Sequence, residues 1–344
     1  MRIKDLFVWS GGESGWSGIM WSPSEGWRIK IFAVFCVAVL CGMLCGCGQR
    51  DVLEANGVPR DIEIRFMWDY AEGADVDGMT VYFFPHAGVG RVWRYDVSGR
   101  AGGKLTVPSG VYDVIAVNND LPDISLSGTN EFGTLTANAI EVSGLSDVSR
   151  ATGMLYGASL ERVEINGCGV TYRQRDGTLK QCPQGLMRCW PDSLSTVYHV
   201  VIEGDKVGTH AAEMAGHLKG LSEGLLISSA LPVGDDTSVL FGFERDGDNE
   251  VSGETIDFAS SRERTHLSLE LTAYCSDGKK YVNEFDVSEQ ALNSSSPRNV
   301  VIILRDINFP DTDPSDDGDV GLDVGVDGWK EVDVTYDTSD GWGN

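Results

Sequence analysis

The sequence predicts an all-β protein of two tandem β-sandwiches that follows an N-terminal export signal. Short runs in which apolar and polar residues alternate recur about every 8–12 residues, which is typical of sandwich folds. The chain contains 42 glycines in 344 residues, and a high glycine content suits many short elements joined by tight turns. A chain of this length is expected to form two domains rather than one.

Residues 1–46 are predicted to be a lipoprotein signal peptide. Ile31 to Cys45 is a continuous apolar run that follows Arg28 and Lys30, and this charge-then-apolar order is typical of export signals. The run is shorter than the roughly 20 residues that a membrane-spanning helix needs. An uncleaved membrane anchor and a buried helix are the alternatives. The leader before Arg28 is unusually long, which leaves Met20 as a second candidate for the true start.

The residues Leu44-Cys45-Gly46-Cys47 close the apolar run and resemble a bacterial lipobox. In a lipobox, the cysteine after the small residue is acylated and becomes the mature N-terminus. The resemblance therefore predicts a lipid on Cys47. Residues 47–60 lack a period and are predicted to be a tether between this lipid and the folded part of the chain.

The formal net charge of the chain is -25. Such an acidic surface repels the phosphate backbone of nucleic acids, so no nucleic-acid partner is expected. It also excludes attachment to anionic lipids through basic residues. Any attachment to a membrane must therefore use the lipid on Cys47 or the apolar run itself.

Residues 61–185 are predicted to form the N-terminal β-sandwich. Asp61 to Trp68 alternates, with Ile62, Ile64, Phe66 and Trp68 on one face, as in a half-buried strand. Val111 to Val117 is apolar at almost every position, which is expected of a strand covered on both faces. Further strand-like runs are found at 79–84, 93–97, 105–107, 124–126, 132–135, 154–156 and 163–165.

Residues 186–310 are predicted to form the C-terminal β-sandwich, because residues 166–191 have a weak pattern and are rich in Gly and Pro. Strands are expected at 197–202, 239–243, 255–258, 266–274 and 299–304. Asp277-Gly278 is a two-residue hairpin signal, so 267–274 should pair with 280–287. Only Thr209 to Lys219 has some helical character.

Residues 311–344 are predicted to be an acidic linker followed by a C-terminal strand. The linker cannot bury itself because it is rich in aspartate. Val332, Val334 and Tyr336 then alternate with polar or acidic residues. A strand after a flexible linker can add to a sheet edge in its own domain or in a partner, so these three residues are candidates for strand donation.

Four cysteines lie beyond the proposed lipidation site, at Cys168, Cys182, Cys189 and Cys275. In an exported chain they could form one or two disulfides, but their wide spacing fits buried free thiols nearly as well. Zinc sites usually contain close pairs such as C-x-x-C, which these residues lack. The sequence leaves the choice between disulfides and thiols open, and gives no pairing.

Several segments together resemble the fimbrillin-like lipoproteins of Bacteroidota, in particular a branch described only as a domain of unknown function. These segments are Met79–Pro85, Gly103–Asn119, Phe285–Ser288, Asn299–Pro310 and Leu322–Trp329. The resemblance implies two tandem transthyretin-like or immunoglobulin-like β-sandwiches on an outer-membrane lipid anchor. It also implies fimbrial subunits as partners, joined by strand exchange.

In this family, polymerising subunits lose an N-terminal strand by cleavage after an arginine, whereas anchors keep their lipid. Arg60 lies just before the first predicted strand. Nothing marks Arg60 as a better cleavage site than an ordinary loop arginine. The resemblance therefore favours an anchor or accessory role over that of a shaft subunit.

No motif for catalysis, a metal or a cofactor stands out. His210, Glu213 and His217 could share a helical face as metal ligands, but a polar face of a short solvent helix is favoured. Asp246, Asp248 and Glu250 lack the EF-hand order and are interpreted as turn carboxylates. Trp68 and Trp93 are predicted core residues, and the aromatic rings that could stack on a sugar are those of Trp190, Trp329 and Trp342.

The sequence therefore predicts a non-enzymatic lipoprotein of the outer membrane that faces the cell surface. We expect a structural, anchoring or adhesive role in fimbria-like assemblies. The alternative is a monomeric surface lipoprotein that binds a glycan or a host ligand. No cofactor is expected, and the oligomeric state is not determined by the sequence.

Overall fold

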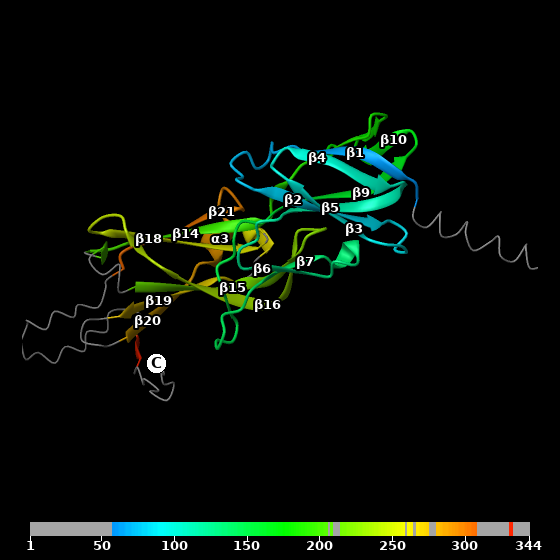
Figure 1. The fold of residues 1–344 in the computed structure, drawn as a ribbon. Coiled ribbons are helices and arrows are strands. Elements are labelled where there is room, and N and C mark those ends of the chain that lie inside the picture. The colour runs from blue at the N-terminus through cyan, green and yellow to red at the C-terminus, as the bar shows by residue number, and fades with distance from the viewer. Residues whose placement is uncertain are drawn as a thin grey trace, which may run out of the picture. The chain divides into compact units, whose positions relative to one another are not determined.

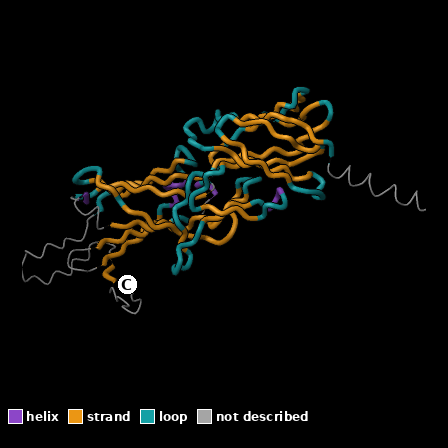
Figure 2. The backbone as a smooth tube through the Cα atoms, in the orientation of Figure 1, coloured by secondary structure: helices purple, strands orange, loops and turns teal. Residues whose placement is uncertain are grey.

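The computed structural model describes residues 57–205, 207–208, 214–258, 260–263, 266–274, 280–307 and 330–332. These residues lie in one compact unit, Asn56–Asn344. Among the described residues strands dominate, and helix is confined to short turns (Figure 1, Figure 2). The prediction of an all-β fold of two sandwiches is confirmed.

The first sandwich packs a three-stranded sheet, in the order β12-β1-β4, against a seven-stranded sheet in the order β11-β10-β9-β5-β2-β3. A short strand, β13, pairs with β9. The bounds of these strands are β1 Pro59–Phe66, β2 Gly78–Pro85, β3 Trp93–Ser98, β4 Gly102–Pro108, β5 Gly110–Asn118, β9 Tyr156–Asn166, β10 Gly169–Arg173, β11 Leu179–Cys182, β12 Leu186–Cys189 and β13 Asp192–Ser193.

The second sandwich packs a four-stranded sheet, β17-β18-β14-β21, against an eight-stranded sheet, β22-β20-β19-β15-β16-β8, in which β7 pairs with β15 and β6 with β7. The bounds are β6 Ile124–Ser127, β7 Thr136–Ala139, β8 Val148–Ser149, β14 Ser195–Glu203, β15 Met214–Leu226, β16 Leu231–Gly242, β17 Glu244–Arg245, β18 Glu250–Phe258, β19 Ser268–Tyr274, β20 Lys280–Asp286, β21 Asn299–Leu304 and β22 Lys330–Val332. Helix α3 spans Ser288–Leu292, and single 3-10 turns lie at Phe132–Thr134 and Ser261–Glu263.

The central strands β2 and β5 are buried on both faces, as the apolar run Val111 to Val117 predicted. Alternate residues face the core of the first sandwich, among them Phe83, Val114 and Ala116. The residues between them, such as Phe84 and Ile115, enter a second apolar cluster. The seven-stranded sheet is therefore a layer between two hydrophobic cores.

This second cluster joins the two sandwiches. It combines side chains of β2 and β5 with Leu135, Leu225 and Phe258, which lie in or beside strands of the second sandwich. A separate core fills the second sandwich itself, with Leu218, Leu269, Val200 and Ile302 among its fully buried residues. The burial of apolar surface therefore continues from one sandwich into the other.

The hairpin predicted around Asp277-Gly278 is confirmed in its strands. β19 pairs with β20 in antiparallel register, with Tyr274 opposite Lys280 and Leu269 opposite Phe285. The turn itself lies outside the described residues.

The helical character expected for Thr209 to Lys219 is wrong where the structure describes the segment. Residues from Met214 onward form β15, in which burial alternates from one residue to the next. Strands β16 and β19 pair with both edges of β15, and this pairing overrides a weak local preference. A Cβ atom at Gly216 would lie 2.4 Å from the Phe241 ring, so any larger residue there would force this ring to move.

Strand pairing crosses the predicted domain boundary between residues 185 and 186 in both directions. β7 and β8, which precede it, pair with β15 and β16 of the second sandwich. β12, which follows it, pairs in parallel with β1 of the first. The division into domains 61–185 and 186–310 stays a prediction, and the pairing argues for strands exchanged between the two halves.

The cluster between the sandwiches can be tested by truncating Leu135, which is fully buried in it. We expect Leu135→Ala to lower the free energy of unfolding by about 2–5 kcal/mol, because the cavity left behind cannot be refilled. Denaturant unfolding measures this change. The matched control is Leu145→Ala, a leucine of the same segment that is 46% exposed, with an expected effect within about 0.5 kcal/mol. Equal effects of the two substitutions would contradict a shared core.

Candidate functional site

The residues predicted to carry function lie at the two ends of the chain, and the structure describes only part of them. Cys47 and the apolar run before it lie outside the described residues, as do Val334 and Tyr336. Val332 is described as the last residue of β22. Lipidation of Cys47 and donation of the C-terminal strand therefore stay predictions.

Strand β22 lies at the edge of the eight-stranded sheet, beside β20 (red in Figure 1). The two strands are antiparallel, with Val332 opposite Lys280 and Lys330 opposite Val282. The backbone of β20 thus accepts a strand from the tail of its own chain. An edge that accepts one extended segment in this way can accept another of similar sequence.

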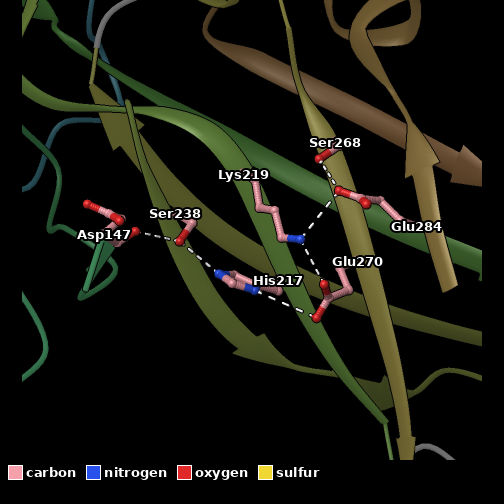
Figure 3. A network of polar contacts seen from close by, with 7 residues as sticks. All are labelled: Asp147, His217, Lys219, Ser238, Ser268, Glu270 and Glu284. Atoms are coloured by element: carbon pink, nitrogen blue, oxygen red, sulfur yellow. Dashed lines mark hydrogen bonds and ion pairs between the residues drawn. The ribbon is translucent and has the colours of Figure 1, made fainter. Parts of the chain in front are cut away.

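A network of polar side chains crosses the outer face of the same sheet (Figure 3). It consists of two adjacent groups, one that joins β20, β19 and β15 around Lys219 and one that joins β15 to β16 through His217 and Ser238. Residues between its members, such as Leu218 and Leu269, are buried on the opposite face. The network therefore ties together the strands that support the edge at β20. Its members are Asp147, His217, Lys219, Ser238, Ser268, Glu270 and Glu284.

Lys219 is the centre of the charged half of the network. Its ammonium nitrogen lies 2.7 Å from a carboxylate oxygen of Glu270 and 3.3 Å from one of Glu284. The Ser268 hydroxyl donates a hydrogen bond of 2.8 Å to Glu284. Burial lowers the pKa of Lys219, but the hydrogen bonds and charges of the two carboxylates outweigh it and raise the pKa overall. Lys219 is therefore charged at neutral pH.

The other half of the network is neutral. The Ser238 hydroxyl lies 2.7 Å from the backbone oxygen of Asp147, which can only accept a hydrogen bond, so Ser238 is the donor. His217 Nε2 lies 2.7 Å from the same hydroxyl and must then donate its own proton to it. Burial lowers the pKa of His217, with Glu270 opposing the effect. The imidazole is thus neutral, with its proton on Nε2.

Ser238, His217 and Glu270 resemble a Ser-His-acid arrangement in composition, but their hydrogen bonds run in the wrong direction for a nucleophile. A general base must accept the hydroxyl proton, whereas His217 donates to Ser238. The His217 Nδ1 to Glu270 Oε1 distance is 3.9 Å, which is too long for a hydrogen bond. Ser238 is also buried. The geometry fits a structural network that holds strands in register.

The helix predicted from the sequence would place His217 on one face with His210 and Glu213, and it does not reveal this network. His210 and Glu213 lie outside the described residues. On β15, His217 faces Glu270 and Lys219 faces Ser268 across the pair of strands. The feature of the sequence that points to the network is the two-residue spacing of polar side chains in His217-x-Lys219 and Ser268-x-Glu270. It identifies the network only once the register is known.

Several other candidate residues are placed by the structure. Trp68 and Trp93 are partly buried and pack against the core of the first sandwich, and Trp190 does the same while also lining a cleft. Trp329 and Trp342 lie outside the described residues. Asp246 and Asp248 lie in the turn between β17 and β18, where Arg245 pairs with Asp248.

Three of the four cysteines are described, and all three are free thiols. Cys168 is exposed, Cys182 half-buried and Cys189 buried. Burial raises the pKa of Cys189 to about 12, so this thiol is unreactive at neutral pH. Cys275 lies outside the described residues.

Two further findings concern the described part of the chain alone. It contains no cluster of three or more His, Cys, Asp or Glu side chains arranged to hold a metal ion. In the same residues, no helix is both long and apolar enough to cross a membrane.

The sequence matches a family model described as "Domain of unknown function (DUF5119)" over residues 46–242. A curated relative from Bacteroides ovatus, named "Putative fimbrium anchoring subunit Fim4B", is 23% identical over 85% of this chain and 93% of its own length. These findings confirm the predicted resemblance to fimbrillin-like proteins.

A solved structure with a TM-score above 0.5 shows the same fold. A "putative adhesin" from Bacteroides ovatus superposes with a TM-score of 0.56 at 20% identity, over 74% of this chain and 95% of that one. The fimbrial anchor protein Mfa2 from Porphyromonas gingivalis gives a TM-score of 0.48 at 12% identity, over 72% of this chain and 91% of that one.

The neutral state of His217 makes stability depend on pH. Its folded pKa lies below the unfolded value of 6.5, so below that pH the unfolded chain binds a proton that the folded chain does not. We expect the melting temperature to fall more between about pH 7.5 and 5.5 in the native protein than in His217→Gln. Thermal unfolding followed by circular dichroism measures the difference. His199→Gln, on β14, controls for the loss of a histidine outside the network, and equal pH dependence in all three proteins would contradict the assignment.

Proposed function

Because the chain belongs to the DUF5119 family, whose function is unknown, we propose a role for it from its relatives and its structure. The proposed role is that of a non-enzymatic lipoprotein that anchors or supports a fimbria-like assembly at the cell surface. The observation that carries this proposal is the match to a relative named as a fimbrium anchoring subunit, which extends over 85% of this chain and 93% of the relative. A match of this extent concerns the whole architecture rather than a shared module.

The position of Arg60 within β1 supports a role as an anchor rather than a shaft subunit. β1 lies between β12 and β4, and it contributes Ile62, Ile64 and Phe66 to the core. Arg60 was expected just before this strand, but it lies within it, opposite Val107. Cleavage after Arg60 would therefore cut a paired strand. A chain that keeps β1 also keeps its covalent connection to the tether and to Cys47.

The proposed attachment to the outer membrane is a lipid on Cys47. We expect Cys47→Ala to move most of the protein from the outer-membrane fraction to the soluble fraction. The reason is that acyl chains contribute about 0.8 kcal/mol per buried CH₂ group, and the acidic surface offers no replacement. Fractionation followed by immunoblotting measures the change.

Cys45→Ala is the matched control, because it removes a cysteine two residues away and leaves the acylation site intact. Retention of Cys47→Ala in the outer-membrane fraction would contradict a lipid anchor at this position.

The proposed contact with fimbrial subunits is strand exchange through the C-terminal segment, which contains Val332, Val334 and Tyr336. The pairing of β22 with β20 supports this, since the described start of the segment, Lys330–Val332, is a strand at the edge of the sheet. We expect the double substitution Val334→Pro and Tyr336→Pro to reduce crosslinking of partner subunits on intact cells at least fivefold. Proline has no backbone N–H to donate to a neighbouring strand, and each lost hydrogen bond weakens the pairing by about 1 kcal/mol.

Thr338→Pro, just beyond the alternating residues, is the control for this experiment. Unchanged crosslinking in the double variant, or an absence of higher-order complexes in crosslinked wild-type cells, would contradict strand exchange.

A further inference from the structure

A large cleft lies beside strand β9, away from both the polar network and β22. Its volume is about 1240 Å³, more than the roughly 300–1,000 Å³ of typical small-molecule sites. Its lining includes residues of β9 and β10 together with Ile227–Ala230 and Arg298. The cleft therefore has room for a ligand of several linked rings.

The cleft is open because β9 lacks a neighbour along part of one edge. On that side β10 pairs with β9 only from Glu164 onward, and β13 pairs only as far as Gly157. No other strand of the described residues pairs with the stretch between. Backbone N–H and C=O groups that point toward this edge, away from β5, are therefore available to a ligand.

A bulge makes the open edge unsuitable for another strand. Glu161 and Arg162 together oppose Asp113 of β5, and Arg162 has a positive φ of 54°. The backbone N–H of Arg162 donates to the Asp113 carboxylate at 2.9 Å. A bulge interrupts regular pairing and turns side chains in new directions, so a ligand with dispersed hydroxyl groups fits this edge better than an extended peptide.

The side chains that line the cleft are rich in hydroxyl and guanidinium groups. Four arginines face it with three carboxylates, in a chain where acidic residues outnumber basic ones by 52 to 27. The hydroxyl groups come from Ser159, Thr171, Ser193, Ser228, Ser229 and Ser260. Such groups both donate and accept hydrogen bonds, as the hydroxyls of a saccharide require.

Three of the arginines are held in place by contacts that leave donors free. Arg175 lies 3.0 Å from Asp192 and 3.6 Å above the Tyr70 ring. Arg298 donates to the backbone oxygen of Leu194 at 2.8 Å, and Arg173 to that of Gly177 at 2.6 Å. A guanidinium has five N–H donors in a planar fork that matches a carboxylate. The cleft therefore favours a ligand that carries carboxylates.

Trp190 adds an aromatic surface to the lining of the cleft. It packs against the core of the first sandwich and also lines the cleft. An aromatic ring offers a broad apolar face against which the C–H face of a sugar ring can stack. The combination of Trp190, arginines and hydroxyls matches the two kinds of surface that an acidic sugar presents.

We propose that this cleft is a binding site for an acidic oligosaccharide, one whose sugar rings carry carboxylates. The carboxylates are bound by Arg173, Arg175 and Arg298, and one ring stacks on Trp190. This goes beyond the anchoring role and does not depend on it. A lipoprotein with this site would attach to acidic glycans as well as to its own assembly.

The test is isothermal titration calorimetry with the full chain purified in detergent. The acidic probes are trigalacturonic acid and 3′-sialyllactose, the neutral probe is maltotriose, and hexaglutamate tests for an acidic peptide. We expect an acidic saccharide to bind at least tenfold more tightly than maltotriose. Failure of both acidic saccharides to bind at about 1 mM would overturn the proposal, as would hexaglutamate binding that is equal or tighter.

Variants then locate the site. Arg173→Gln should weaken binding of the acidic probe about tenfold or more, the usual effect of losing a charge-assisted hydrogen bond. Ser229→Trp, at an exposed position of the lining, should block the cleft without removing a buried contact. The matched controls are Arg94→Gln and Ser143→Trp, which lie outside the lining. If both cleft variants still bind the acidic probe, the ligand binds elsewhere and the proposal is overturned. It is also overturned if only the control variants lose binding.

Discussion

The burial of both faces of the sheet around β2 and β5 is the constraint on which the rest of the structure depends. Antiparallel sheets commonly have one solvated face, but here both faces carry apolar side chains. Val81 and Phe83 face the core of the first sandwich, and Tyr82 and Phe84 face the second cluster. The second sandwich, with strands from the preceding segment, covers that second face. Covering it is worth about 25 cal/mol for each Å² of apolar surface removed from water.

This arrangement explains why the strands are exchanged between the two halves of the chain. Leu135 and Phe84 lie in the same apolar cluster. The strand that follows Leu135, β7, pairs with β15 of the second sandwich rather than with a strand of the first. Strand β9 has a partly open edge for a separate reason, because β10 and β13 do not meet along it.

Polar side chains on the outer face of the eight-stranded sheet favour the correct register of β20, β19, β15 and β16. This register matters because the edge at β20 accepts a further strand. Lys219 bridges Glu270 and Glu284 on two neighbouring strands, and His217 separately joins β15 to β16 through Ser238. Half-exposed ion pairs of this kind contribute little stability one by one. Their geometry nevertheless favours one register, since a slip by one residue would bring Leu218 and Leu269 to the solvent face.

Local pattern in the sequence determined the fold class, the tandem sandwiches and the β19–β20 hairpin, because alternation and turn residues report on the two faces of a strand and on its reversal. It also predicted the double burial of Val111 to Val117, which the structure confirms at Val114, Ile115, Ala116 and Val117. Lipidation at Cys47 rests on sequence alone. Only the tertiary structure decided that Met214 to Lys219 is a strand, that β7 and β8 belong to the second sandwich, and which polar residues meet around Lys219. These features depend on pairing between residues that lie far apart in the chain. The alternation of apolar and polar residues within one strand does not specify which other strand it pairs with.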